Sequence, residues 1–145
     1  MKTLYESILD NEDVLVDKIK KTVKNPFVKL KFIYDNTPRF SEWMEAVDKE
    51  LKKIKLPKGV FYNTLTNAIR FISKNGNGLF DIYFDDDFIK STKKDAYCIL
   101  VDYSKDYSKS LNDEEVRIIR DFCKQYDFKS TNPNNIRNTW LYLEK

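Results

Sequence analysis

The residues whose types and spacing could perform chemistry are carboxylates near the middle of the chain. The stretch DIYFDDD carries Asp81 and Asp85, and a later apolar run ends in Asp102. If neighbouring strands bring these groups together, they form the oxygen-rich site that Mg²⁺ binds and that two-metal nucleases use. Acids at the end of a strand also commonly mark a solvated turn, and we favour that interpretation. A metal site at Asp81, Asp85 and Asp102 remains the alternative.

Several common kinds of catalytic chemistry are excluded by the absence of histidine from the chain. Ser–His and Cys–His catalysis need histidine as the activating base. Zinc sites that combine cysteine and histidine need it as a ligand. The two cysteines are too few for a zinc site with four cysteine ligands. Cys98 and Cys123 lie among apolar neighbours, so we expect buried, reduced thiols. We therefore expect no enzyme and no cofactor.

Lysines are concentrated near the N-terminus, where KIKKTVKNPFVKLKF has six in fifteen residues with phenylalanines between them. Phosphates are contacted by lysine and bases stack on aromatic rings, so this stretch could bind nucleic acid. Many of the lysines also fall on the outer face of a predicted helix, where solvated charge is expected anyway. The nucleic-acid alternative would use Lys18, Lys20, Lys21, Lys24, Lys29 and Lys31.

Length and composition are those of one folded domain. The chain has 145 residues, of which 41% are apolar and only three are glycine, so a core and regular elements are expected. The net charge of +3 is small for a specialised nucleic-acid-binding domain. Apolar runs are too short to span a bilayer, so we expect no membrane partner. Some of the tyrosines of the last third should reach the surface, where they could anchor a protein interface.

The elements that must position these residues follow from hydrophobic spacing. In the first half, apolar residues recur at three- or four-residue intervals, which predicts helices. They span residues 3–10, 12–24, 26–36, 41–55 and 60–78. Residues 26–36 also alternate, so a strand stays open as an alternative there.

The second half alternates between apolar and polar residues, which predicts strands. They span residues 79–87, 96–104 and 136–144, and the second should be central because its apolar run is continuous. Polar loops are expected at 87–95 and 128–135. Between strands two and three, Asn112 and Glu115 form a capping box for a helix that ends near Tyr126.

This order predicts a single α+β domain over residues 1–145. A helical N-terminal layer would lie on a small β-β-α-β sheet of about three strands. Residues 1–11 would either be a detachable segment or form the first helix of the fold.

The opening segment resembles something more specific. Leu4, Tyr5, Glu6, Ser7, Ile8 and Leu9 are followed by several acids. This LYESIL segment is similar to the start of many small, uncharacterised proteins of crAss-like and related Bacteroidales phages. The resemblance covers about the first twenty residues and implies a phage or prophage origin, but no activity and no catalytic residues.

The resemblance leads to a functional hypothesis. A short opening shared by otherwise different proteins would suit a docking or packaging address, in which an amphipathic helix lies in a partner's groove. The alternative is that the segment only packs on this protein's own core. We expect a non-enzymatic phage-associated protein that acts through protein–protein contacts, either packaged in the virion or working in the host cytoplasm. Its partner would be a phage structural protein or a host protein. The residues that would bind it are Leu4, Tyr5, Glu6, Ile8 and Leu9.

Overall fold

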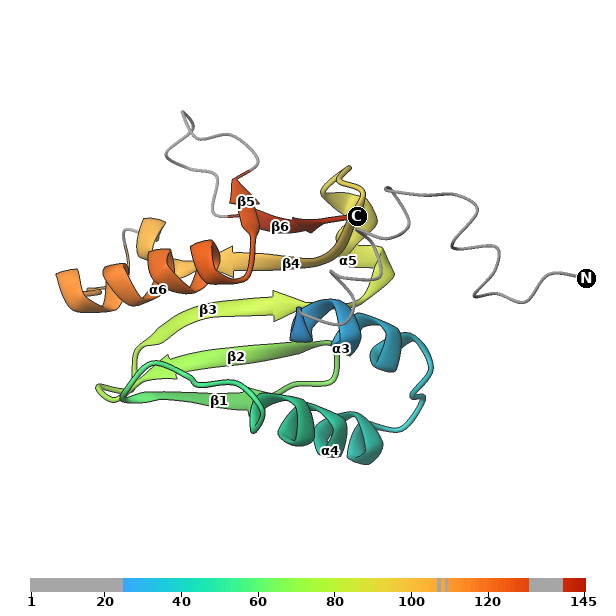
Figure 1. The fold of residues 1–145 in the computed structure, drawn as a ribbon. Helices are drawn as coiled ribbons and strands as arrows, with labels where there is room; N and C mark the ends of the chain where they lie inside the picture. Colours follow the sequence, from blue (N-terminus) through green and yellow to red (C-terminus); the bar gives the residue numbers. More distant parts are fainter. Residues whose placement is uncertain (1–24, 107, 109, 131–139) are drawn as a thin grey trace, which may run out of the picture.

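The computed structural model describes residues 25–106, 108, 110–130 and 140–145, and the structural statements below concern those residues. In chain order they form helices α3 and α4, strands β1 to β3, helix α5, strand β4, the 3-10 turn η1, helix α6 and strands β5 and β6 (Figure 1). Helices and antiparallel strands are mixed, which confirms the α+β class. None of the described helices is long and apolar enough to cross a membrane.

Two helices open the described part of the chain. Helix α3 (Pro26–Asp35) begins after Asn25, whose side chain accepts a hydrogen bond from the Phe27 amide. Pro26 fits the first helical position because that position needs no N–H donor. Helix α4 spans Phe40–Leu51. The helices predicted at 26–36 and 41–55 are therefore confirmed, and the strand alternative for residues 26–36 is wrong. The helices predicted at 3–10 and 12–24 lie outside the described residues.

Six strands form one antiparallel sheet in the order β1-β2-β3-β4-β6-β5. Strands β3, β4 and β6 correspond to the three predicted strands, and β4 is central as expected. The sheet is larger than the expected three strands because β1, β2 and β5 join it. The bounds in chain order are Val60–Thr64, Ala68–Ser73, Gly78–Tyr83, Ala96–Asp102, Phe128–Ser130 and Trp140–Glu144.

The helix predicted at residues 60–78 is wrong, because this stretch forms the β1–β2 hairpin and the turn into β3. Its aromatic and β-branched residues favour strands, and Phe71 of β2 packs its ring on Phe27 of α3. Gly76 has φ of 83° in the turn before β3, a conformation that glycine adopts without strain. The glycine therefore belongs to a hairpin and does not end a helix.

Two further elements replace predicted loops. Helix α5 (Asp86–Ser91) begins at the end of the strand predicted at 79–87 and continues into the loop expected at 87–95. Strand β5 occupies the start of the loop expected at 128–135. Helix α6 (Asp113–Gln125) is confirmed together with the capping box. The turn η1 (Tyr103–Lys105) follows β4 directly.

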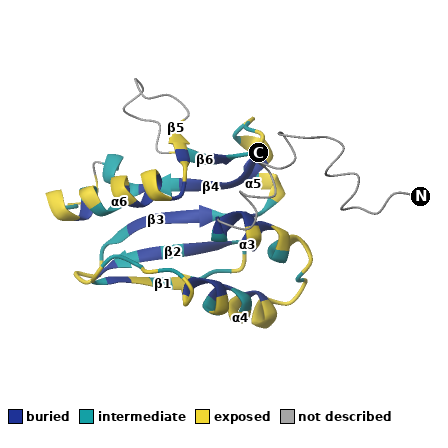
Figure 2. Ribbon diagram, in the orientation of Figure 1, coloured by how far each residue is buried: buried dark blue, intermediate teal, exposed yellow. Residues whose placement is uncertain are grey.

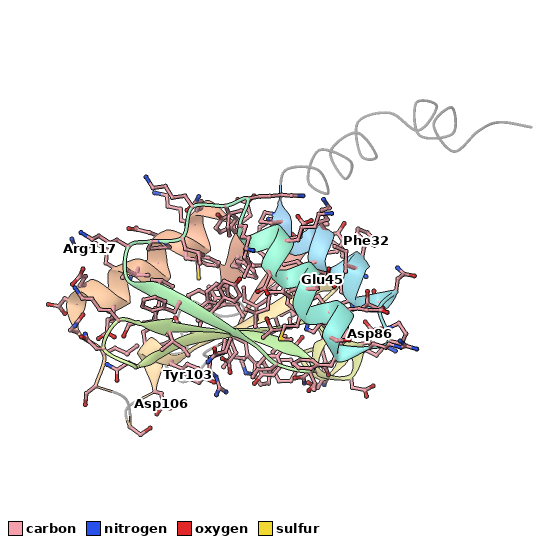
Figure 3. All side chains as sticks on the ribbon, turned by 90° about the horizontal axis from the view of Figure 1, so that it is seen from below. Phe32, Glu45, Asp86, Tyr103, Asp106 and Arg117 are labelled. Atoms are coloured by element: carbon pink, nitrogen blue, oxygen red, sulfur yellow. The ribbon has the colours of Figure 1, made fainter. Side chains whose placement is uncertain are left out.

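Helices α3, α4 and α6 lie on one side of the sheet, as the view from below shows (Figure 3). Between them and the sheet lies an aromatic core, in which the Phe122 ring contacts Phe71 and Phe80. Burial is greatest in the middle strands, while the outer sides of the helices are exposed (Figure 2). Cys98 and Cys123 are buried and unpaired, which confirms the prediction of reduced thiols.

Candidate functional site

The face of the sheet opposite α3, α4 and α6 carries the candidate site. Successive residues of a strand point to opposite faces, so the register assigns each side chain to one face. Phe71 packs on the helix side, and Arg70 therefore points to the other face together with its cross-strand neighbours. One row crosses five strands on this face and contains Asn63, Arg70, Asp81, Val101 and Trp140.

Asp81 is the centre of this row, and its side chain is completely buried. Arg70 donates to both carboxylate oxygens, with Nε–Oδ1 at 2.9 Å and Nη2–Oδ2 at 3.2 Å. The Tyr103 hydroxyl donates to Oδ2 at 2.5 Å, and the Tyr83 hydroxyl donates to the same oxygen at 3.3 Å. Burial, together with the neighbouring Asp81 carboxylate, raises the pKa of both tyrosines. Both therefore act as hydroxyl donors at neutral pH.

Arg70 is held by this carboxylate while its own side chain stays 43% exposed. A guanidinium has five N–H donors, of which two donate to Asp81, and Tyr103 also interacts with this guanidinium, so fewer than three remain for another molecule. Hydrogen bonding to Asp81 raises the pKa of Arg70 further, so its charge is constant. The arrangement therefore presents a fixed, oriented donor at the surface.

A hollow of about 660 Å³ lies beside Arg70. Strands β1 to β3 form its floor and the segment after β4 forms its rim. In Figure 3, Tyr103 and Asp106 lie on this side, away from Phe32, Glu45 and Arg117 on the helices. Its lining residues are Asn63, Arg70, Ile72, Gly76, Gly78, Tyr103, Asp106 and Ser108.

Apolar side chains adjoin this hollow. Phe61 of β1 is 61% exposed, and it pairs across the strands with half-buried Ile72 on the same face. On the same face, the next row of side chains includes Tyr83. Helix α5 covers this row, because the Phe88 ring stacks on the Tyr83 ring. We call Phe61, Asn63, Arg70, Ile72 and Tyr103 the open-face patch.

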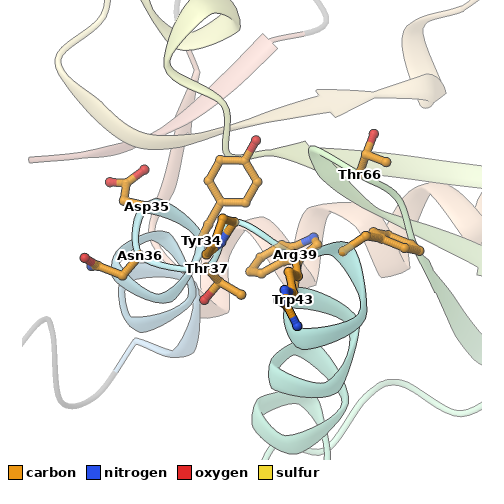
Figure 4. A pocket seen from close by; sticks show the side chains of 9 residues that line it. Tyr34, Asp35, Asn36, Thr37, Arg39, Trp43 and Thr66 are labelled. Atoms are coloured by element: carbon orange, nitrogen blue, oxygen red, sulfur yellow. The ribbon is translucent and has the colours of Figure 1, made fainter.

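Other hollows formed by the described residues include two on the helix side of the molecule. One, of about 520 Å³, is at the turn between α3 and α4, where Tyr34, Arg39 and Trp43 line it (Figure 4). The Trp43 indole N–H in its wall already donates to the Leu65 carbonyl at 3.0 Å. The other, of about 660 Å³, lies between α6 and the sheet, and Cys123 is in its wall. Neither holds an arrangement like the one at Arg70, in which a buried carboxylate orients a partly exposed cation.

The three carboxylates of the predicted metal site are not brought together. Asp81 and Asp102 point to opposite faces, because Asp81 pairs with Val101 and Asp102 is the next residue. Asp102 accepts from the Ser104 amide at 2.7 Å, and Asp85 caps α5 by accepting from the Phe88 amide at 3.0 Å. In the described part of the chain, no group of three or more Cys, Asp or Glu residues could hold a metal ion.

The predicted nucleic-acid surface is also reduced. Lys31 is 3% exposed, and its ammonium donates at 2.8 Å each to Asp35, Asp86 and the Phe84 carbonyl. It therefore cannot contact phosphate, so this part of the alternative is wrong. Lys29 pairs with Glu50 at 3.1 Å but stays half exposed. Lys18, Lys20, Lys21 and Lys24 lie outside the described residues, as do the proposed partner-binding residues Leu4, Tyr5, Glu6, Ile8 and Leu9.

Comparison with known proteins adds no assignment, since no family model, curated protein or solved structure matches this chain. Sequence reasoning missed Arg70 because it lay within a predicted helix. The sequence signal for it is weak, because AIRFIS does not alternate strictly between apolar and polar residues, and the alternation around Arg70 is seen only in the burial of the strand.

Proposed function

We propose that this chain is a non-enzymatic, phage-associated protein that binds a protein partner on the open face of its sheet. The observation that carries the proposal is Arg70, which Asp81 orients while nearly half of its side chain is exposed. Arginine and aromatic residues supply most of the binding energy in protein interfaces. A side chain that is already held in place also loses less conformational entropy when a partner binds.

The neighbours of Arg70 support a protein partner. Phe61 and Ile72 provide an adjoining apolar surface, and Asn63 and Tyr103 add polar groups. An apolar area with a few oriented polar groups is the composition of an interface core. The phage association is supported by the opening LYESIL segment, which resembles that of phage proteins. The partner would then be a phage structural protein or a host protein, met in the host cytoplasm or in the virion.

The test is affinity capture from phage-infected cells followed by mass spectrometry. The variant Phe61→Thr/Ile72→Thr removes the apolar surface but keeps residues that favour strands. Met44→Gln on α4 is the matched control, because Met44 is similarly exposed (42%) but belongs to the helix layer. We expect a partner that the wild type and the control capture and that the double variant loses. Identical capture by all three proteins would contradict the proposal.

The same capture tests the two other hypotheses. A truncated protein lacking residues 1–11 should keep the partner if the open-face patch binds it. If only the full-length chain captures phage proteins, the opening segment is the address and the patch is not the site. Recovery of DNA or RNA whose binding falls steeply with salt would favour the nucleic-acid alternative.

A further inference from the structure

Strand β1 is an edge of the sheet, since β2 is its neighbour on one side and no described residue forms a strand on the other. Figure 1 shows it as the lowest strand, and Figure 3 looks onto this edge. An edge strand presents backbone N–H and C=O groups that can pair with another strand. Which groups point outward follows from the hydrogen bonds of the hairpin.

The outward groups belong to alternate residues. The Leu65 amide donates to the Ala68 carbonyl at 2.7 Å, so Leu65 points its backbone toward β2. Because bonded and non-bonded pairs alternate in an antiparallel ladder, Phe61 and Asn63 also point toward β2. Val60, Tyr62 and Thr64 therefore point outward. Of these, the Val60 amide is already bonded to the Pro57 carbonyl at 3.1 Å.

This edge lacks the features that usually prevent pairing. Protected edges carry charged residues, proline or a bulge, or they are very short. Strand β1 reads VFYNT, which contains neither charge nor proline, and its register with β2 has no irregularity. The opposite edge, β5, has three residues and carries Lys129. The contrast indicates that β1 is the open pairing edge of the sheet that the described residues form.

We infer that β1 pairs with β1 of a second copy of this chain, in antiparallel orientation about a two-fold axis at Tyr62. In this register, Tyr62 faces Tyr62 of the second copy, and Val60 faces Thr64. The amides of Tyr62 and Thr64 then donate to the carbonyls of Tyr62 and Val60 in the other copy. The two sheets join into one continuous sheet with both helix layers on the same side.

Charge complementarity favours a second copy as the occupant. Helix α4 lies beside β1, and the Tyr62 hydroxyl donates to Asp48 of this helix at 2.7 Å. The two-fold axis makes the α4 helices of the two copies antiparallel. Their exposed residues are acidic near the start, at Glu42 and Glu45, and basic near the end, at Lys49 and Lys52. The acidic half of one helix therefore faces the basic half of the other, and no charged residue of β1 opposes pairing.

Sedimentation of the full chain over a wide range of concentrations tests this inference. We expect a monomer–dimer equilibrium in the wild type. Thr64→Pro removes an outward N–H without touching the bonds to β2, and Thr64→Val is the matched control that keeps this N–H. Two hydrogen bonds are lost by symmetry, so Thr64→Pro should weaken dimerisation at least about tenfold, while Thr64→Val should not. A wild type that stays monomeric at every concentration would overturn the inference, and so would a dimer that a correctly folded Thr64→Pro variant retains unchanged.

A crosslink tests the register without depending on the folding of the proline variant. Phe61 would face Asn63 of the second copy at a Cα separation of about 4.5 Å, within the range of a disulfide. Within one chain these two residues are about 6.7 Å apart along the strand, which is too far for their Cβ atoms. Oxidised Phe61→Cys/Asn63→Cys should give a covalent dimer, and Phe61→Cys alone should give much less. Absence of the dimer in the double variant would overturn the register.

Discussion

Replacing Lys31 with methionine tests whether its buried ammonium stabilises the fold. The ammonium joins α3 to the segment before α5 through the Phe84 carbonyl, and it forms ion pairs with Asp35 and Asp86. Burial opposes the charged form of Lys31, but the hydrogen bonds that its ammonium donates to the two carboxylates outweigh burial and raise the pKa of Lys31. Lys31→Met keeps most of the apolar stem and removes only the charge and its three bonds.

The expected loss is the balance of three terms. The Phe84 residue is buried, so its carbonyl would lose a donor at a cost of about 1–3 kcal/mol. Asp35 and Asp86 are 40% and 64% exposed and return to water, so each lost pair costs only about 0–1 kcal/mol. Removing the buried charge also removes its desolvation penalty, which offsets part of this loss of stability. We therefore expect the free energy of unfolding to fall by about 2–3 kcal/mol.

Denaturant unfolding followed by tryptophan fluorescence measures this change, because Trp43 is buried in the core. Lys29→Met is the matched control on the same helix. Lys29 is half exposed, and Lys53 remains 3.2 Å from the same buried Glu50 carboxylate, so we expect a much smaller loss than for Lys31→Met. A Lys31→Met variant as stable as the wild type would refute the reasoning. The desolvation free energy of the buried charge would then equal the free energy gained from its hydrogen bonds and ion pairs.

Acid provides an independent check on the same contacts. The hydrogen bond from Lys31 lowers the pKa of Asp86 below its ordinary value. A carboxyl whose pKa is lowered by folding stabilises the protein above its unfolded pKa of about 3.9, and this contribution is lost as the pH falls through the folded value. The difference in stability between the wild type and Lys31→Met should therefore narrow below about pH 4. A difference that stays constant to lower pH would show that Asp86 does not take part.

Three further predictions concern other parts of the fold. Asp81→Asn should lower the free energy of unfolding by about 2–3 kcal/mol in denaturant titration, because it leaves Arg70 without its buried counter-charge, although half-exposed Arg70 regains water. Asn112→Ala removes the cap of α6 and should cost about 1 kcal/mol in the same assay. Burial raises the pKa of Cys98 and brings that of Cys123 to about 12, so a thiol reagent at neutral pH should react slowly with Cys123 and should react with Cys98 only as fast as the protein opens. Reaction of Cys98 faster than unfolding would contradict its buried placement.

Local signals were sufficient for several elements. Helix α6 was predictable because Asn112 and Glu115 cap it and its apolar residues recur on one face. Strand β4 was predictable as central from its continuous apolar run. These elements depend on residues close to one another in the chain. The burial and ion pairing of Lys31 were not predictable in this way. Asp86 lies 55 residues away, and only the packing of α3 near α5 brings the two residues together.

The candidate site could not be found from the sequence because residues 60–78 were interpreted as a helix. Phe61 and Ile72 fit helical spacing by coincidence, and that interpretation separated Arg70 from Asp81. With the helix corrected to a turn near Gly76, the two flanking strands pair, but the register shifts between Phe71 and Ile72, so counting from the turn alone does not give the pairing of Arg70 with Asp81. The same correction exposes β1 as an edge and places Phe61 on the open face. The open-face patch and the pairing edge thus follow from a single hairpin, and variants that separate them, such as Thr64→Pro and Ile72→Thr, can assign partner binding and self-association to different sides of one strand pair.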